Sequence, residues 1–318
     1  MRRFAIILLF LVIGCSNTAN IIPREFSQDV EIYFCPRDNC SDHLVDFINS
    51  AKTSVHCAFY DLDLSNVILA LAEKSKHLDV KLVIDDDNIG GLNGSRIRTD
   101  DSKQLTHNKF CVIDGKAVWT GSFNPTYNGD DYNNNNVIVL YSKYLAENYE
   151  KEFDELWNLN FGSGKRVKRP TIYLNNIKIE NFFCPEDYCE ARVANTIKKA
   201  NQSVYFMTFT FTSEPIADTL LFLENVTIKG IFEKRQRGGY SQFTRLKDFG
   251  LDVRLDDNPK TMHHKVFIID KKMVITGSYN PTQAANTKND ENVLIIHDED
   301  ISQKYLDEFN YLWENKTI

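Results

Sequence analysis

The chain has 318 residues, of which 42% are hydrophobic and 25% are charged, and these are the proportions of a folded globular protein rather than a disordered one. Its formal net charge of −7 excludes a broadly basic surface, so a polyanionic ligand would need a local basic patch. This length allows two domains of ordinary size or one large domain.

The N-terminal residues resemble an export signal. Two arginines follow Met1, and an unbroken apolar run covers residues 4–13. This run is too short to span a bilayer as a stable helix, but it is typical of the hydrophobic region of a signal peptide. It leads into Gly14-Cys15, which resembles the box at which bacterial lipoproteins are cleaved and lipidated.

We therefore expect residues 1–15 to be a signal peptide with a lipoprotein box, and the exported protein to be anchored to the membrane through a lipidated Cys15. A plain signal peptide, which would give a secreted or periplasmic protein, and an uncleaved anchor are the alternatives. A Cys15→Ala variant that fractionates and migrates like the wild type would exclude lipidation.

The rest of the chain contains an internal duplication, and a cysteine pattern is its first landmark. Cys-Pro-x-Asp-x-Cys occurs at residues 35–40 and again at residues 184–189. In an exported protein this pattern favours one local disulfide per copy, although a metal site that joins the two pairs is an alternative. The expected disulfides are Cys35–Cys40 and Cys184–Cys189. Cys57 and Cys111 lie in apolar strand-like runs, and we expect them to be buried core residues.

The two halves repeat the same order of expected elements. The first half is expected to form a helix over 44–52 and strands over 54–60 and 81–85, and the second half a helix over 193–200 and strands over 203–209 and 229–233. Each half closes with an amphipathic helix whose aromatic residues recur every four positions and pack in the core. These are Tyr149, Phe153 and Trp157, and Tyr305, Phe309 and Trp313. Strand-like runs that alternate with helices predict an α/β fold with a mixed β-sheet in each half.

We expect an N-terminal lobe over residues 29–160, a linker over 161–175 and a C-terminal lobe over 176–318. Glycine, serine and proline mark the linker, which also carries a cluster of basic residues. These basic residues are either solvated or contact anionic lipid or nucleic acid.

Each half also contains His-x-Lys-x4-Asp followed by Gly-Ser-aromatic-Asn, and the spacing from His to Gly is identical in the two copies. The motif residues are His107, Lys109, Asp114, Ser122 and Asn124 in the first half, and His263, Lys265, Asp270, Ser278 and Asn280 in the second. A histidine and a lysine two positions apart on a strand project to the same side. The apolar run after the lysine predicts a buried strand that holds the pair rigidly.

This set of residues suits phosphodiester cleavage. Two lysines and two asparagines can neutralise and orient the non-bridging oxygens. One neutral imidazole can attack phosphorus and form a phosphohistidine, while the other, protonated, donates to the leaving oxygen and later activates water. Because the lysines supply the positive charge, we expect neither a cofactor nor a metal, and we find no compact carboxylate cluster of the sort that holds catalytic magnesium.

These motifs resemble the signature of the phospholipase D superfamily, and the resemblance covers residues 30–315. It implies two pseudo-symmetric lobes with one active site at their interface. The residues expected to line that site are His107, Lys109, Asn124, His263, Lys265 and Asn280. The resemblance also implies that Asp114 and Asp270 support the structure rather than touch the substrate.

Many members of the superfamily have an acidic residue downstream that hydrogen-bonds a catalytic histidine. Glu291 takes this place in the second half, whereas the same step in the first half reaches the neutral Asn135. We therefore expect Glu291 to support His263, and we favour His263 as the nucleophile, although the usual assignment in the superfamily favours the first motif.

The compact pair of lobes resembles the small nucleases of this superfamily, so we expect DNA or RNA as substrate ahead of a phospholipid. A basic and aromatic loop over 233–240, with Arg245 and Lys247, could hold a nucleic-acid backbone, and residues 96–103 are a weaker equivalent. Solvated loops are the alternative. A phospholipase D-type hydrolase or transphosphatidylase, and a catalytically inactive binding module, are the other functional hypotheses.

Overall fold

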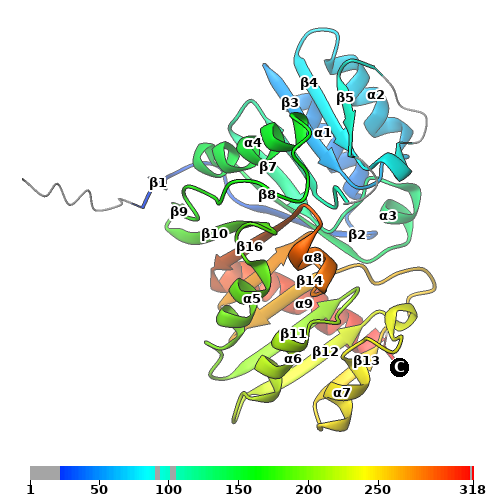
Figure 1. The fold of residues 1–318 in the computed structure, drawn as a ribbon, viewed down its shortest axis with the longest axis vertical. Coiled ribbons are helices and arrows are strands. Elements are labelled where there is room, and N and C mark those ends of the chain that lie inside the picture. The colour runs from blue at the N-terminus through cyan, green and yellow to red at the C-terminus, as the bar shows by residue number, and fades with distance from the viewer. Residues whose placement is uncertain (1–21, 90–93, 101–104, 316) are drawn as a thin grey trace, which may run out of the picture.

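The computed structural model describes residues 22–89, 94–100, 105–315 and 317–318. The expected signal peptide and Cys15 lie outside these residues. Within the described ranges, the structure has no helix with the length and apolar composition that are needed to cross a bilayer. The described chain forms two lobes that stand one above the other in Figure 1, with the N-terminal lobe uppermost.

The first lobe is built on a seven-stranded sheet with the order β2-β8-β7-β6-β3-β4-β5. The strands are β2 (Glu31–Cys35), β3 (Ser54–Phe59), β4 (Asp79–Ile84), β5 (Ile97–Thr99), β6 (Lys109–Ile113), β7 (Ala117–Gly121) and β8 (Asn135–Leu140). β3, β4 and β5 pair in parallel, and the remaining neighbours pair antiparallel. The sheet is therefore mixed, as predicted.

The second lobe repeats this arrangement in a nine-stranded sheet with the order β1-β9-β10-β16-β15-β14-β11-β12-β13. Its strands are β1 (Arg24–Glu25), β9 (Thr171–Leu174), β10 (Ile177–Cys184), β11 (Ser203–Thr208), β12 (Thr227–Phe232), β13 (Asp252–Leu255), β14 (Lys265–Ile269), β15 (Met273–Gly277) and β16 (Glu291–His297). From β10 to β13, the order matches that of the first sheet strand for strand. β1 and β9 extend the edge, so the second sheet begins inside the segment that was expected to be linker.

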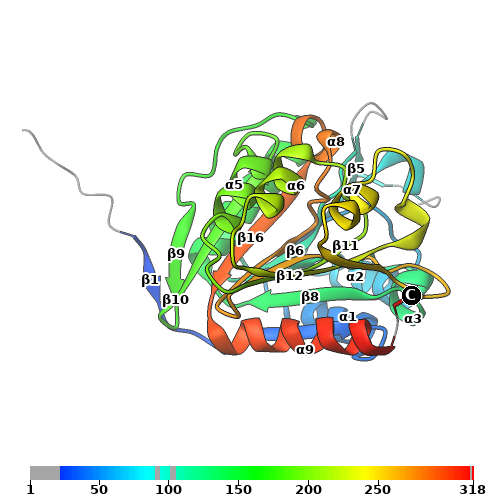
Figure 2. The ribbon, with the colours of Figure 1, turned by 90° about the horizontal axis from the view of Figure 1, so that it is seen from below.

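Helices form the remaining layers. α1 (Cys40–Ser50) and α2 (Ser65–Lys74) cover the outer face of the first sheet, while α5 (Cys189–Ile197), α6 (Glu214–Leu221) and α7 (Phe243–Asp248) cover that of the second. α4 (Lys143–Trp157) and α9 (Glu299–Asn315) pack on the inner faces. Figure 2 shows α9 on the opposite side of the second sheet from α5 and α6. α3 (Tyr127–Asp131) and α8 (Gln283–Thr287) are short helices that precede β8 and β16.

The aromatic faces of α4 and α9 build the central core, as the spacing predicted. Tyr149, Phe153, Tyr305 and Phe309 are almost completely buried, in one apolar cluster that includes residues of both sheets. Burying side chains of this size contributes about 1.5–3 kcal/mol each. The two lobes therefore share a core and do not pack as independent domains.

Disulfides join Cys35 to Cys40 and Cys184 to Cys189, one in each copy of the cysteine pattern. A third disulfide joins Cys57 to Cys111, which we had expected only to be buried core residues. These two cysteines face each other directly across the antiparallel pair β3–β6, with Cα atoms 4.0 Å apart. Their pairing depends on strand register, which the separate apolar runs did not reveal.

The aspartates that end the two motifs lie at hairpin turns, where they bind backbone of the same lobe. Asp114 accepts hydrogen bonds from the N–H groups of Lys52, Thr53 and Ser54 at 2.6–3.1 Å. Asp270 accepts three equivalent bonds from residues 201–203 at 2.8–3.2 Å. Each carboxylate therefore holds the start of the strand that pairs with its motif strand. This strand is β3 beside β6 in the first lobe and β11 beside β14 in the second.

Candidate active site

The two motifs meet where the lobes touch. β6 and β14 begin at Lys109 and Lys265, and the residues just before each strand bridge to the other lobe. Thr106 pairs with Asp290, and Met262 pairs with Asn134, both as isolated parallel bridges. Each incoming motif segment therefore lies beside the start of β16 or β8 of the opposite lobe.

This pairing decides which group supports each histidine. Nδ1 of His107 lies 2.8 Å from Oε2 of Glu291. Nδ1 of His263 lies 2.8 Å from Oδ1 of Asn135 and 3.0 Å from the carbonyl oxygen of Ser122. The expectation that Glu291 supports His263 is therefore wrong, because each histidine is oriented by a side chain of the other lobe.

The serine of each Gly-Ser pair holds these supporting groups in place. Ser278 Oγ donates to Oε2 of Glu291 at 2.6 Å and accepts from the N–H of Asn292. Ser122 Oγ lies 3.2 Å from Oδ1 of Asn135 and accepts from the N–H of Asn136. Ser278 therefore positions the side chain that contacts His107, and Ser122 positions the side chain that contacts His263.

The glycines before these serines are required by space and by conformation. Gly121 has a φ of 145° and Gly277 a φ of 136°, in the region that side chains rarely adopt. A Cβ atom on either residue would collide with the backbone carbonyl of the adjacent strand, at Asn136 or Asn292. The Gly-Ser turn can approach β8 and β16 only because glycine precedes the serine.

The two lysines form a buried cationic centre. Lys109 and Lys265 have 0% and 3% of their surface exposed, and each Nζ donates to the carbonyl of the histidine in its own motif, at 2.7 and 2.9 Å. Burial lowers the pKa of Lys109 to about 7, and burial and the charge of Lys109 lower the pKa of Lys265. Two buried ammonium groups without an anion repel each other, so an incoming phosphate would relieve this repulsion.

Burial also controls the histidines and Glu291. Burial and the charges of the two lysines lower the pKa of both His107 and His263 well below the ordinary value for an imidazole. Burial raises the pKa of Glu291 to about 8. The empty site therefore favours neutral imidazoles, which is the form that a nucleophile needs, and a bound phosphate would allow one of them to be protonated.

The asparagines of the two motifs are not fully engaged by the fold. The side-chain oxygens of Asn124 and Asn280 are buried, and neither has a hydrogen-bond partner among the residues that the structure describes. A buried amide without a partner is costly unless a ligand satisfies it. An amide oxygen only accepts a hydrogen bond, so it is the Nδ2 groups of these two side chains that can donate to a phosphoryl group.

Sequence reasoning missed two pairs of residues around this centre. The rings of Tyr60 and Phe209, the first pair, lie edge-on to His107 and His263, with centroids 5.0 and 4.8 Å apart.

The second pair is Asn136 and Asn292. The shift of 156 residues that relates His107 to His263 also relates these two asparagines, so the duplication would have revealed them. The side chains of these two asparagines cross the interface: Asn136 binds Thr276 and Tyr305, and Asn292 binds Asn108, Thr120 and Tyr149.

The basic residues singled out in the sequence are mostly engaged elsewhere. Arg245 pairs with Asp218 on the outer helices of the second lobe, and Arg96 donates to backbone carbonyls of its own lobe. Arg98 stacks on Trp157. Arg235 reaches towards a motif, since its guanidinium contacts Pro259 and Thr261 just before His263. Residues 101–104 lie outside the described ranges.

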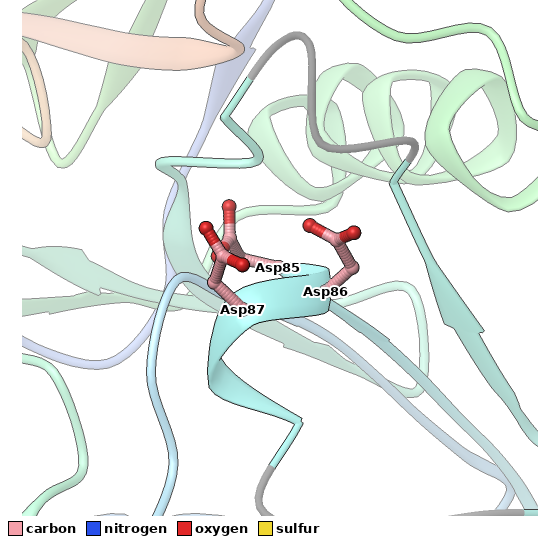
Figure 3. A group of neighbouring side chains, drawn as sticks. All are labelled: Asp85, Asp86 and Asp87. Carbon is pink, nitrogen blue, oxygen red and sulfur yellow. The ribbon is translucent and has the colours of Figure 1, made fainter.

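Two groups of carboxylates come together in the fold, one from three consecutive aspartates and one from residues far apart in the sequence. Asp85, Asp86 and Asp87 follow β4 at the one-turn helix η1 (Asp86–Asn88), with their carboxylates on the same side of the turn (Figure 3). The second group brings Glu152 and Glu155 of α4 to Glu186 of the second lobe. Neither group contains a motif residue.

The chain belongs to the family whose model is described as "Cardiolipin synthase, PLD-like domain", which matches residues 44–157 and 193–313. A phospholipase D of Rickettsia conorii is 35% identical over 136 residues, which are 42% of this chain and 68% of that protein. The human mitochondrial cardiolipin hydrolase is 35% identical over 127 residues, which are 39% of this chain and 50% of that protein.

A solved structure with the same fold is the phosphatidylserine synthase of Haemophilus influenzae Rd KW20, with a TM-score of 0.69 at 14% identity over 91% of this chain and 87% of that chain. Family membership confirms the resemblance to the phospholipase D superfamily. The chain is a phosphodiester hydrolase of that superfamily, with both of its His-x-Lys motifs complete.

Proposed function

We propose that this protein hydrolyses phosphodiesters of single-stranded nucleic acid through a phosphohistidine on His107. The contact between His107 and Glu291 carries the assignment of the nucleophile. In its ionised form Glu291 accepts a hydrogen bond from Nδ1 and leaves Nε2 unprotonated for attack. The positive charge that the imidazole gains on phosphorylation lowers the raised pKa of Glu291, so it favours the ionised form and is stabilised by it. An amide oxygen, which His263 has instead, orients the ring but stabilises this charge less well.

In the first step, Nε2 of His107 attacks phosphorus while protonated His263 donates its proton to the leaving oxygen, and the P–O bond breaks. In the second step, His263 takes a proton from water, the resulting hydroxide attacks phosphorus, and the N–P bond to His107 breaks. Lys109 and Lys265 bind the non-bridging oxygens in both steps. This assignment reverses our expectation from the sequence, because Glu291 supports the other histidine.

The rim beside His263 supports nucleic acid as the substrate. Tyr132, which is 39% exposed, lies three residues before Asn135, and its hydroxyl is 3.1 Å from that of the exposed Tyr127. Nζ of Lys260 lies 5.3 Å from the centre of the Tyr132 ring. Exposed tyrosines next to a cation are the groups that bind unpaired bases and their phosphates.

The rim predicts a change in substrate preference. Tyr132→Ala is expected to lower kcat/KM for a single-stranded oligonucleotide by about tenfold, since stacking contributes ~1–3 kcal/mol per base. Activity on a small phosphodiester such as bis(p-nitrophenyl) phosphate should stay close to that of the wild type. Phe222→Ala, which removes an exposed aromatic ring from the end of α6, is the matched control and should change neither.

A phospholipid is the second candidate substrate, because the relatives are named phospholipase D and cardiolipin hydrolase. Single-stranded DNA, duplex DNA, RNA and vesicles of phosphatidylglycerol with cardiolipin should be compared at equal phosphodiester concentration. Faster turnover of lipid than of every nucleic acid, with no effect of Tyr132→Ala, would replace our substrate assignment with the second one.

Turnover is expected to persist in excess EDTA at temperatures well below the melting transition. The positive charges directed at the phosphate belong to Lys109 and Lys265. Among the described residues, neither of the two clusters of carboxylates contains a motif residue. Initial rates with and without EDTA, followed by addition of magnesium or calcium, provide the measurement. A loss of kcat in EDTA that a divalent ion restores, with the fold intact by circular dichroism, would contradict this mechanism.

A further inference from the structure

Glu152 and Glu155 of the acidic group on α4 line a cavity at the junction of the two lobes, which Lys151, Lys165, Arg166 and Lys168 also line. The cavity has a volume of about 740 Å³, and its walls are α4 and the segment over residues 160–168. Carboxylate oxygens of Glu152, Glu155 and Glu186 lie within 4.8 Å of one another. Glu152 is only 6% exposed, so this group is not an ordinary solvated acidic patch.

A further buried carboxylate, that of Asp290, lies nearby, although it is not among the three whose oxygens lie within 4.8 Å of one another. Asp290 is 2% exposed; its Oδ1 accepts from the N–H of Gly162 at 2.7 Å, and its Oδ2 is buried with no hydrogen-bond partner in the described part of the chain. After burial, the charge of Asp290 contributes most to the raised pKa of Glu152, followed by that of Glu186. One oxygen of Glu186 is also buried and unsatisfied within the described residues.

The internal duplication shows what occupies the equivalent place in the other half. The shift of 156 residues that relates the motifs also relates Glu152 to Glu308 and Glu155 to Tyr311, and the cysteine patterns relate Glu186 to Arg37. In that half, the guanidinium of Arg37 pairs with Glu308 and lies 4.0 Å from the centre of the Tyr311 ring.

The equivalent place is therefore filled by a positive charge of the protein itself. His264 Nε2 also contacts Glu308, at 3.2 Å, whereas its counterpart Asn108 offers Glu152 only a neutral amide at 3.2 Å. Across the described residues, no lysine, arginine or histidine forms an ion pair with Glu152, Glu155, Glu186 or Asp290. Buried carboxylates at this spacing repel one another unless a proton or a cation neutralises them.

The segment over residues 160–168 approaches the acidic group closely at Gly164. A Cβ atom on this residue would collide with the carboxylate oxygens of Glu155 and Glu186. The backbone N–H of the next residue, Lys165, donates to Glu155 at 3.1 Å. The segment therefore closes directly over the acidic group and holds Glu155 in place.

We propose that Glu152, Glu155 and Glu186, with the buried carboxylate of Asp290 nearby, bind a calcium ion that joins the two lobes. Carboxylate oxygens favour hard divalent cations, and calcium accepts irregular sets of carboxylates with waters as further ligands. Calcium–oxygen distances of about 2.4 Å place ligands on opposite sides of the ion about 4.8 Å apart, so carboxylate oxygens that all lie within 4.8 Å of one another can share one ion.

Thermal melting of the full chain in metal-free buffer tests this site. Calcium at a hundredfold excess over its Kd is expected to raise the Tm by about 5 °C. Glu186→Arg should supply the charge that Arg37 supplies in the other half. This variant is expected to melt above the wild type in EDTA and to show no further increase with calcium. Asp87→Asn, in the other carboxylate group, is the matched control and should respond to calcium like the wild type.

Calorimetric titration provides a second measurement that does not depend on how well Glu186→Arg folds. Glu186→Gln keeps the size of the side chain and should weaken calcium binding at least about tenfold. An unchanged Tm of the wild type in millimolar calcium, or an undiminished calcium response in Glu186→Arg or Glu186→Gln, would overturn the proposal. Loss of the response in Asp87→Asn would overturn it as well, because the ion would then lie at Asp85–Asp87. A larger shift with magnesium than with calcium would overturn the choice of ion.

Discussion

Replacing either His107 or His263 with alanine is expected to abolish turnover, with kcat falling by about four orders of magnitude or more. The two imidazoles act in the same two steps, so the double variant should be no worse than either single one. Steady-state kinetics on bis(p-nitrophenyl) phosphate and on an oligonucleotide would measure the loss. Substantial activity in one single variant would contradict a site shared by the two lobes.

The two single histidine variants should differ in whether a phosphohistidine accumulates. With a substrate whose leaving group needs no proton, such as a p-nitrophenyl ester, His263→Ala should still be phosphorylated but should release the phosphoryl group slowly. Rapid quenching and peptide mapping are expected to place the label on the peptide that contains His107. A label on the His263 peptide of the wild type would reverse the roles and leave the two-histidine mechanism intact, whereas a label on neither peptide would remove that mechanism.

Glu291→Gln is expected to lower kcat by about 10- to 100-fold, as often follows when the partner of a catalytic group is lost. Glutamine can still accept the hydrogen bond from Nδ1 of His107, so the ring keeps its place 2.8 Å away, but the carboxylate that stabilises the phosphorylated imidazole is lost. KM should change less than kcat, because the effect arises in the chemical steps. A normal kcat in this variant would show that orientation alone suffices.

Asn135→Asp is the matched change on the other side. It gives His263 a charged partner in place of an amide at 2.8 Å, which should raise the pKa of His263 and shift the pH profile towards higher pH. We expect a change of only several-fold in kcat, since His263 is not itself phosphorylated. Equal losses in Glu291→Gln and Asn135→Asp would mean that the site tolerates neither change in buried charge, and would contradict the different roles of the two histidines.

The sequence was sufficient to predict the α/β fold, the duplication and the motif residues, because each of these depends on short stretches of chain. A histidine and a lysine two positions apart on a strand point the same way in any fold that contains the strand. Aromatic residues every four positions define one helical face before the helix has a partner. The spacing from His107 to Asn124, repeated from His263 to Asn280, was therefore informative without coordinates.

The tertiary structure alone decided which residues of the two halves meet. Glu291 follows His263 by 28 residues but contacts His107, which is 184 residues away, because Thr106 and Asp290 pair across the interface. Strand register likewise pairs Cys57 with Cys111, and lobe packing brings Glu186 against α4. Such contacts depend on how two complete lobes share one core. The composition of each segment therefore determined its local structure and its chemistry, whereas the partner of each catalytic group was set by the packing of the lobes.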